Sequence, residues 1–196
     1  EQGYKLRPVK MGARDSQHKN QVEKVRVPVK FSTQVPDDSL FKVSIPGKFY
    51  KFGEDPSLDQ RQYADMANGS YYMVTRILTN GWMWGHSTDK VYSTIDSLLY
   101  ENIPGRIISR QKITRNGYKG IDITNKTWRG DVQRYNIFVM PFEVVIFKMS
   151  GTGDYVLKGE EASKFFSSIQ LKGYTSDATT KWKTYSPPYG GFAIDL

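Results

Sequence analysis

The chain of 196 residues contains no cysteine and only two histidines. Without cysteine there is no disulfide framework, no thiolate nucleophile and no cysteine-bound zinc. His18 and His86 are the only imidazoles, and neither belongs to a metal motif such as H-E-x-x-H. No stretch approaches the roughly 20 apolar residues that a membrane-spanning helix requires. We therefore expect no metal site, no cofactor and no membrane span in this chain.

Motifs of the common enzyme classes are also missing. The sequence has no G-x-S-x-G and no P-loop, and Gly151-x-Gly153 lacks the third glycine of a dinucleotide site. The neighbouring Glu160 and Glu161 fit the first turn of a helix, where the helix dipole favours negative charge. We expect no catalytic residues and no enzyme, and keep an enzyme of unidentified class as a third hypothesis.

The composition is that of an ordinary folded domain with uneven charge. Hydrophobic residues make up 38%, aromatic residues 14% and charged residues 24%, with a net charge of +8. Two basic blocks stand out: residues 1–30 hold eight Lys or Arg against three Asp or Glu, and residues 106–134 hold eight against two. This length suits one domain with extensions.

The patterning divides the chain into three parts. Residues 1–36 are basic and interrupted by proline, which is typical of a lead-in or linker, with a candidate edge strand at residues 25–31. Residues 37–172 carry the periodic segments of a domain. Residues 173–196 are rich in turn residues and are interpreted as a linker, followed by the start of a further strand.

The periodic segments predict a mixed domain. Alternating or β-branched runs predict strands at residues 41–45, 71–78, 107–115, 118–125, 132–140 and 142–150. Asn116-Gly117 predicts a type I′ hairpin between two of these strands. Helices are expected between the capping residues 87–89 and Pro104, and around residues 162–169, whereas residues 48–70 are expected to be irregular. The fold class is α+β: an antiparallel sheet of about six strands with two main helices packed on it.

Four segments together resemble the PsbP-like α/β/α sandwich. They are FKVSIPGKF (residues 41–49), GRIISRQKITRNGYKGIDI (105–123), RYNIFVMPFEVVIFKMSG (134–151) and EEASKFFSSIQL (160–171). The resemblance covers residues 38–172 and is greatest to uncharacterised bacterial cell-envelope proteins. It implies a binding or assembly module with an extracytoplasmic location, and it offers no active-site motif that could be carried over to this chain.

Two stretches offer aromatic side chains for binding. Trp82, Trp84 and His86 lie in a glycine-containing loop, a setting in which ligand-contacting aromatics often occur. Trp128 and Arg129 lie in a second turn that could extend the same surface. The alternative is that the loop folds its indoles onto the core, because buried tryptophan is common.

The second basic block offers an anion-binding alternative. Arg110, Lys112, Arg115 and Lys119 lie on one predicted hairpin, where they could contact nucleic acid or an acidic glycan. Nucleic-acid sites usually add stacking aromatics or a basic helix, which this hairpin lacks, so we do not expect nucleic acid as the partner. A solvated positive face is the simpler interpretation.

The last residues resemble an earlier strand. Phe192, Ile194 and Leu196 alternate as residues 41–45 do, and each run follows a proline-containing stretch. One interpretation is that a second copy of the domain begins here; the other is an added edge strand of the same sheet. We therefore expect a noncatalytic module of a larger bacterial envelope protein, which binds another protein or neighbouring domains of its own chain.

Overall fold

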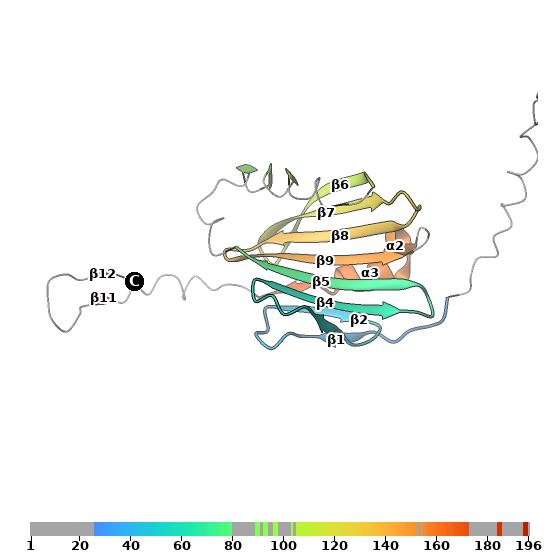
Figure 1. Cartoon of the computed structure of the whole chain (residues 1–196), viewed down its shortest axis with the longest axis horizontal. Coiled ribbons are helices and arrows are strands. Elements are labelled where there is room, and N and C mark those ends of the chain that lie inside the picture. Colours follow the sequence, from blue (N-terminus) through green and yellow to red (C-terminus); the bar gives the residue numbers. More distant parts are fainter. Residues whose placement is uncertain are drawn as a thin grey trace, which may run out of the picture.

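The computed structural model describes residues 26–79, 89–90, 92–93, 96–97, 103, 105–151, 153, 155–172, 184–185 and 194–195. Seven strands form one antiparallel sheet, called here the large sheet (Figure 1). Their order across the sheet is β3-β4-β5-β9-β8-β7-β6. The strands are β3 (Tyr50–Phe52), β4 (Leu58–Asp65), β5 (Ser70–Leu78), β6 (Arg106–Arg115), β7 (Tyr118–Lys126), β8 (Val132–Val139) and β9 (Glu143–Gly151).

A small sheet and two helices cover one face of the large sheet, called here the helix face. The small sheet has the order β1-β2-β10, formed by β1 (Ser32–Gln34), β2 (Phe41–Ile45) and β10 (Gln170–Leu171). The helices are α2 (Tyr155–Lys158) and α3 (Glu160–Ser167). They lie behind the large sheet in Figure 1.

Strand alternation places the main core on the helix face. Every second residue of β2 is buried, and Phe41 meets Phe147 of β9 with 5.4 Å between ring centroids. Phe165 of α3 likewise meets Tyr72 of β5 at 5.2 Å. The Phe165-Phe166 pair in the sequence therefore faces the core of the domain, where large aromatic side chains bury the most apolar area.

The opposite face of the large sheet carries a second, smaller apolar cluster. Tyr92 is buried there against Ile121, Ile123, Tyr135, Ile137 and Val144. The described residues around Tyr92, at positions 89–90, 92–93 and 96–97, are helical. They fall within the segment that the sequence predicts as the first helix; the rest of that segment lies outside the described residues.

The structure confirms the α+β class and the predicted hairpin. Asn116 and Gly117 both have positive φ angles, 49° and 83°, as a type I′ turn between β6 and β7 requires. The strands predicted at residues 41–45, 71–78, 107–115, 118–125, 132–140 and 142–150 are all present to within two residues at each end.

The expected count of about six strands is wrong, because the large sheet has seven strands and a separate sheet has three. Residues 48–70 are not irregular: they form β3 and β4. β4 is polar on both faces and only partly buried, so it lacks the alternation that identifies a strand. The candidate edge strand at residues 25–31 is also misplaced, because the strand is β1 at Ser32–Gln34.

The end of the chain contributes one further pair of strands. β11 (Thr184–Tyr185) and β12 (Ile194–Asp195) pair with each other in antiparallel fashion. β12 is therefore a strand, as its alternation predicts. Within the described residues it pairs with β11 in a two-stranded sheet and does not extend the large or the small sheet. The hypothesis of a second domain copy stays a prediction.

Candidate functional site

Three aromatic side chains are exposed on the face opposite the helices, at the β3 end of the large sheet. Tyr50 and Phe52 alternate along β3 and are 70% and 61% exposed, and Tyr71 of β5 is 51% exposed. Alternation explains the position of Tyr71, because its neighbour Tyr72 is fully buried on the helix face. Exposed aromatic residues that gather in one area are typical of a contact surface.

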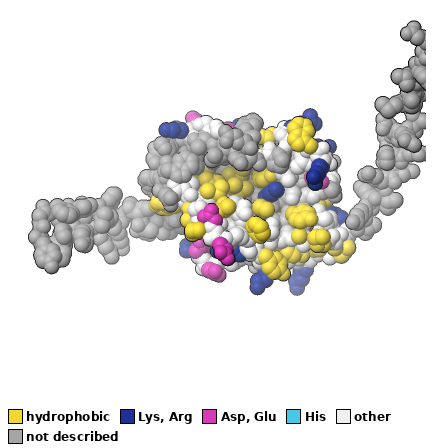
Figure 2. Space-filling model, viewed as in Figure 1, with side chains coloured by type: hydrophobic (Ala, Val, Ile, Leu, Met, Phe, Trp, Pro, Cys, Tyr) yellow, Lys and Arg dark blue, Asp and Glu magenta, His cyan; other side chains and the backbone are white. Residues whose placement is uncertain are grey.

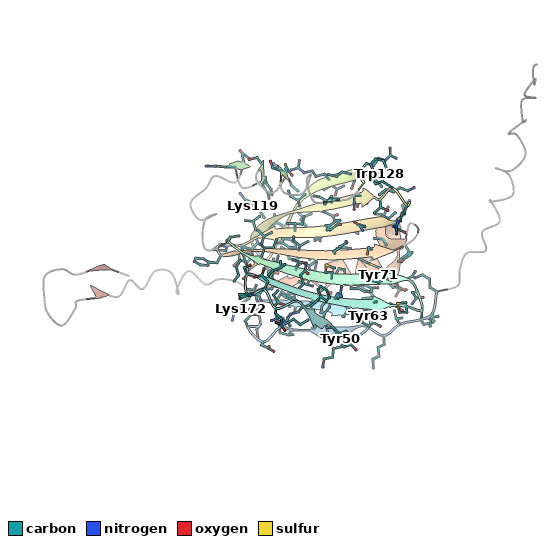
Figure 3. The ribbon with its side chains drawn as sticks, viewed as in Figure 1. Tyr50, Tyr63, Tyr71, Lys119, Trp128 and Lys172 are labelled. Atoms are coloured by element: carbon teal, nitrogen blue, oxygen red, sulfur yellow. The ribbon has the colours of Figure 1, made fainter. Side chains whose placement is uncertain are left out.

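A groove of about 590 Å³ is lined by two of these side chains, Tyr50 and Tyr71. Its lining includes Tyr50, Tyr71, Met73 and Lys148, which come from β3, β5 and β9. Hydrophobic side chains are visible across this side of the molecule in Figure 2, and Figure 3 shows Tyr50 and Tyr71 over β3–β5. We call Tyr50, Phe52, Tyr71, Met73 and Lys148 the tyrosine face.

Lys148 is the charged member of the tyrosine face. It pairs across the sheet with Met73 on one side and Tyr135 on the other, and its Nζ lies 5.3 Å from the Tyr135 ring centroid. Burial lowers the pKa of Lys148, because the ammonium group loses water without gaining a counter-ion. No described residue forms a salt bridge with it. A carboxylate brought to this groove would supply the missing charge.

The predicted aromatic surface is only partly described. Trp82, Trp84 and His86 lie outside the described residues. Trp128, in the turn between β7 and β8, is 89% exposed, and Arg129 beside it is exposed as well. The turn leads into Val132, the first residue of β8, and the label of Trp128 in Figure 3 marks this end of the large sheet. The tyrosine face lies elsewhere, on β3, β5 and β9.

The four cations of the anion-binding alternative are not on one face. Arg110 and Lys112 point away from the helices: Arg110 pairs with Asp96, and the Lys112 ammonium lies 5.3 Å from the Tyr92 ring centroid. Arg115 lies on the helix face, where its Nη2 donates to the Phe166 carbonyl at 3.1 Å. Lys119 is exposed beyond the hairpin turn. The hairpin therefore presents its charges to two different surfaces.

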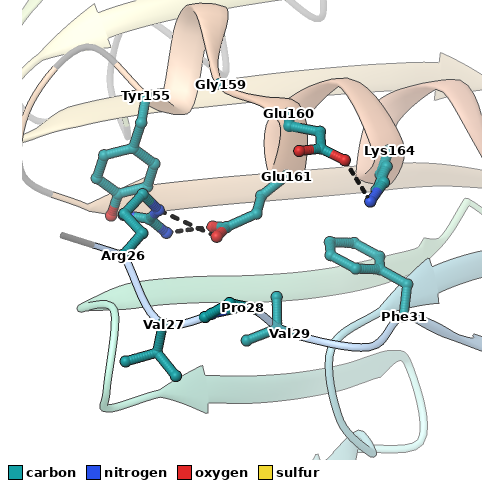
Figure 4. Close-up of a pocket in the computed structure, with 10 residues that line it drawn as sticks. All are labelled: Arg26, Val27, Pro28, Val29, Phe31, Tyr155, Gly159, Glu160, Glu161 and Lys164. Carbon is teal, nitrogen blue, oxygen red and sulfur yellow. Dashed lines mark hydrogen bonds and ion pairs between the residues drawn. The ribbon is translucent and has the colours of Figure 1, made fainter.

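A smaller cavity of about 340 Å³ lies beneath residues 26–31 (Figure 4). The Arg26 guanidinium stacks on Tyr155 at 3.7 Å from the ring centroid and pairs with Glu161. Glu160 pairs with Lys164 at 2.6 Å. All four charges lining this cavity thus neutralise one another, which indicates a structural contact between the N-terminal segment and α3.

The part of the chain that the structure describes has neither a metal-binding cluster nor a membrane-spanning helix. It contains no group of three or more His, Cys, Asp or Glu that could hold a metal ion. None of its helices is both long and apolar enough to cross a membrane.

The fold matches solved structures, although no family model and no curated protein matches the sequence. The cyanobacterial PsbP protein of Synechocystis is 10% identical, with a TM-score of 0.52 over 74% of this chain and 95% of that one. A Pseudomonas aeruginosa protein of unknown function, described as a putative regulator, is 13% identical, with a TM-score of 0.42 over 68% and 91%. A Bacteroides thetaiotaomicron protein is 11% identical, with a TM-score of 0.43 over 79% and 50%.

The match to the cyanobacterial protein shows that this chain has a PsbP-like α+β fold, as the sequence segments indicate. Because the identity is so low, the likeness concerns the fold alone. Fold does not determine function, which depends on the side chains of particular surfaces.

Proposed function

We propose that this chain is a noncatalytic protein-binding or assembly module that docks its partner on the tyrosine face. The observation that carries the proposal is the exposure of Tyr50 and Tyr71, which line one groove, with the exposed Phe52 on the same face of β3 as Tyr50. Tyrosine provides large contact area with little loss of side-chain entropy, and aromatic residues are enriched at interfaces.

The charge of the groove specifies the partner further. Lys148 is a partly desolvated cation, and no carboxylate of a described residue forms a salt bridge with it. A partner segment that combines apolar side chains with an Asp or Glu would cover the aromatics and neutralise Lys148 at once. We therefore propose an acidic and apolar protein segment as the occupant, supported by charge complementarity.

The proposal extends to the setting of the module. We propose an extracytoplasmic place in a larger bacterial envelope protein, in which the partner is another protein or a neighbouring domain. The support is the resemblance of residues 38–172 to bacterial cell-envelope proteins. Polyanion binding by the hairpin receives less support, because Arg115 faces away from Arg110 and Lys112 and because Arg110 is already paired with Asp96.

Selection from a random peptide library displayed on phage tests the docking surface. The full chain is immobilised, and enriched peptides are then measured against Tyr50→Ser/Tyr71→Ser. We expect peptides that carry apolar residues and Asp or Glu, with affinity falling about tenfold or more in the double variant.

The matched control is Trp128→Ser, which removes an exposed aromatic at another place on the molecule. It should leave the affinity unchanged, and Lys148→Met should remove the preference for acidic peptides. Peptides that bind the double variant as tightly as the wild type, or a library that yields no binder, would contradict the proposal.

A further inference from the structure

A polar cleft of about 650 Å³ lies on the helix face, between α3 and the strands β6, β7 and β8. The main apolar core lies on this face, but here the sheet contributes Gln111, Arg115, Asp122, Arg134 and Asn136. The helix side contributes Ser163 and Ser167, which are four residues apart and therefore share one face of α3. The volume falls within the range of small-molecule sites, in which convergent polar groups fix the orientation of the ligand.

Arg134 is held in a fixed position within the cleft. Its Nε and Nη2 donate to the Asp122 carboxylate, with the Nη2 bond at 2.6 Å, and its guanidinium lies 4.5 Å from the centroid of the Phe166 ring. The Asp122 carboxylate along one edge of the guanidinium and the Phe166 ring beside it together fix the orientation of the Arg134 side chain. Within the described residues no hydrogen bond engages its Nη1.

Two further cations line the same cleft. Arg115 donates from Nη2 to the Phe166 carbonyl at 3.1 Å, while its Nε is buried and finds no partner among the described residues. Lys158, at the end of α2, is exposed and forms no salt bridge with a described residue. Three cations therefore face a single carboxylate, that of Asp122, so the lining carries an excess of positive charge.

We propose that this cleft binds a small molecule through a carboxylate or phosphate group. Planar guanidinium groups match both anions geometrically, and a fixed arginine loses little entropy on binding them. Gln111 and Ser163 can hydrogen-bond neutral polar parts of the same molecule. The site is separate from the tyrosine face. Arg134 points to the helix face of β8, whereas its neighbour Tyr135 points to the opposite face, where it lies beside Lys148.

Nuclear magnetic resonance titration of the full chain tests this site with defined probes. Succinate and inorganic phosphate are added separately at physiological ionic strength, and dimethyl succinate serves as the neutral comparison. We expect saturable shifts of the Arg115 and Arg134 side-chain resonances with at least one anion and none with the diester. Shifts with succinate alone assign a carboxylate ligand, and shifts with phosphate alone assign a phosphate ligand.

Three charge-removing variants separate a specific site from general attraction to a basic protein. Arg115→Gln and Lys158→Gln should weaken anion binding about tenfold, since each removes a charge-assisted hydrogen bond. Lys112→Gln removes the same charge from the other face of β6 and should change nothing. Lys158 is exposed and unpaired among the described residues, so its variant should fold normally. The absence of saturable shifts with both anions, or equal weakening in Lys112→Gln, would overturn the proposal.

Discussion

Arg76 on β5 connects three carboxylates from separate segments of the chain. It forms salt bridges with Asp38 and Glu143 at 2.7 Å each and with Asp59 at 3.6 Å. Its side chain is 13% exposed and that of Glu143 only 3%. Removing one partner of such a buried network leaves the other charges without compensation, which is more costly than the net value of the pair itself.

We expect Arg76→Gln to lower the free energy of unfolding by about 3–5 kcal/mol, because Glu143 would remain buried without the charge of Arg76. Arg61→Gln is the matched control: among the described residues Arg61 pairs with Asp59 on its own strand, and losing that more exposed pair should cost about 1 kcal/mol or less. Urea denaturation of the two variants gives the comparison. Equal losses would show that the Arg76 network does not have the assigned role.

Lys148 should reduce stability rather than increase it. Burial lowers its pKa below the ordinary 10.5, so the folded protein holds the proton less tightly than the unfolded chain does. The stability cost of the charge is therefore full below the folded pKa and fades as the pH rises toward 10.5. A residue that lowers stability at an exposed groove fits a binding role.

Lys148→Met should accordingly raise the free energy of unfolding at neutral pH and flatten its rise with pH below 10.5. Lys51→Met, at an exposed position on β3, provides the control and should have little effect. Thermal denaturation across a series of pH values measures both. A lower melting temperature for Lys148→Met at neutral pH would disprove the assignment.

At the scale of elements, the segment of residues 26–31 is held by a few specific contacts. Arg26 pairs with Glu161 and stacks on Tyr155, and the Val27 amide donates to Asn68 Oδ1 at 2.8 Å. Asn68 Nδ2 donates back to the Val27 carbonyl at 3.0 Å. The segment has no strand pairing of its own before β1, so these side chains secure it.

We expect Arg26→Ala to speed amide hydrogen exchange in residues 27–34 while the exchange of β5 and β9 stays unchanged, because local opening does not require the core to unfold. Exchange measured by mass spectrometry resolves the two regions. Arg129→Ala, a surface substitution in another turn, serves as the control. Unchanged exchange in residues 27–34 would mean that Arg26 does not hold the segment.

The elements that the sequence predicts well are those in which one face is buried. β2 and β9 alternate clearly, and α3 carries an apolar stripe that ends in Phe165 and Phe166. β4 was missed because it is polar on both faces. The tyrosine face was missed for another reason: alternation in YYMVTRIL separates Tyr71 from Tyr72, but it cannot show which face the helices cover.

At the scale of the whole molecule, the two faces of the large sheet differ in what they contain. The helix face contains the main core and the polar cleft, and the other face contains the cluster around Tyr92 beside the tyrosine face. Positive charge is not confined to one face, because the basic hairpin places Arg115 on the helix face and Arg110 and Lys112 on the other. Net charge alone could therefore not locate a binding surface.

Photo-crosslinking in the native cells tests the proposed docking surface most directly. The full chain carries the photoreactive residue benzoylphenylalanine in place of Tyr71 or, as the control, in place of Trp128. We predict a covalent adduct with another protein from position 71 that Tyr50→Ser abolishes, and no adduct of the same mass from position 128. No adduct from position 71, or identical adducts from both positions, would contradict the account.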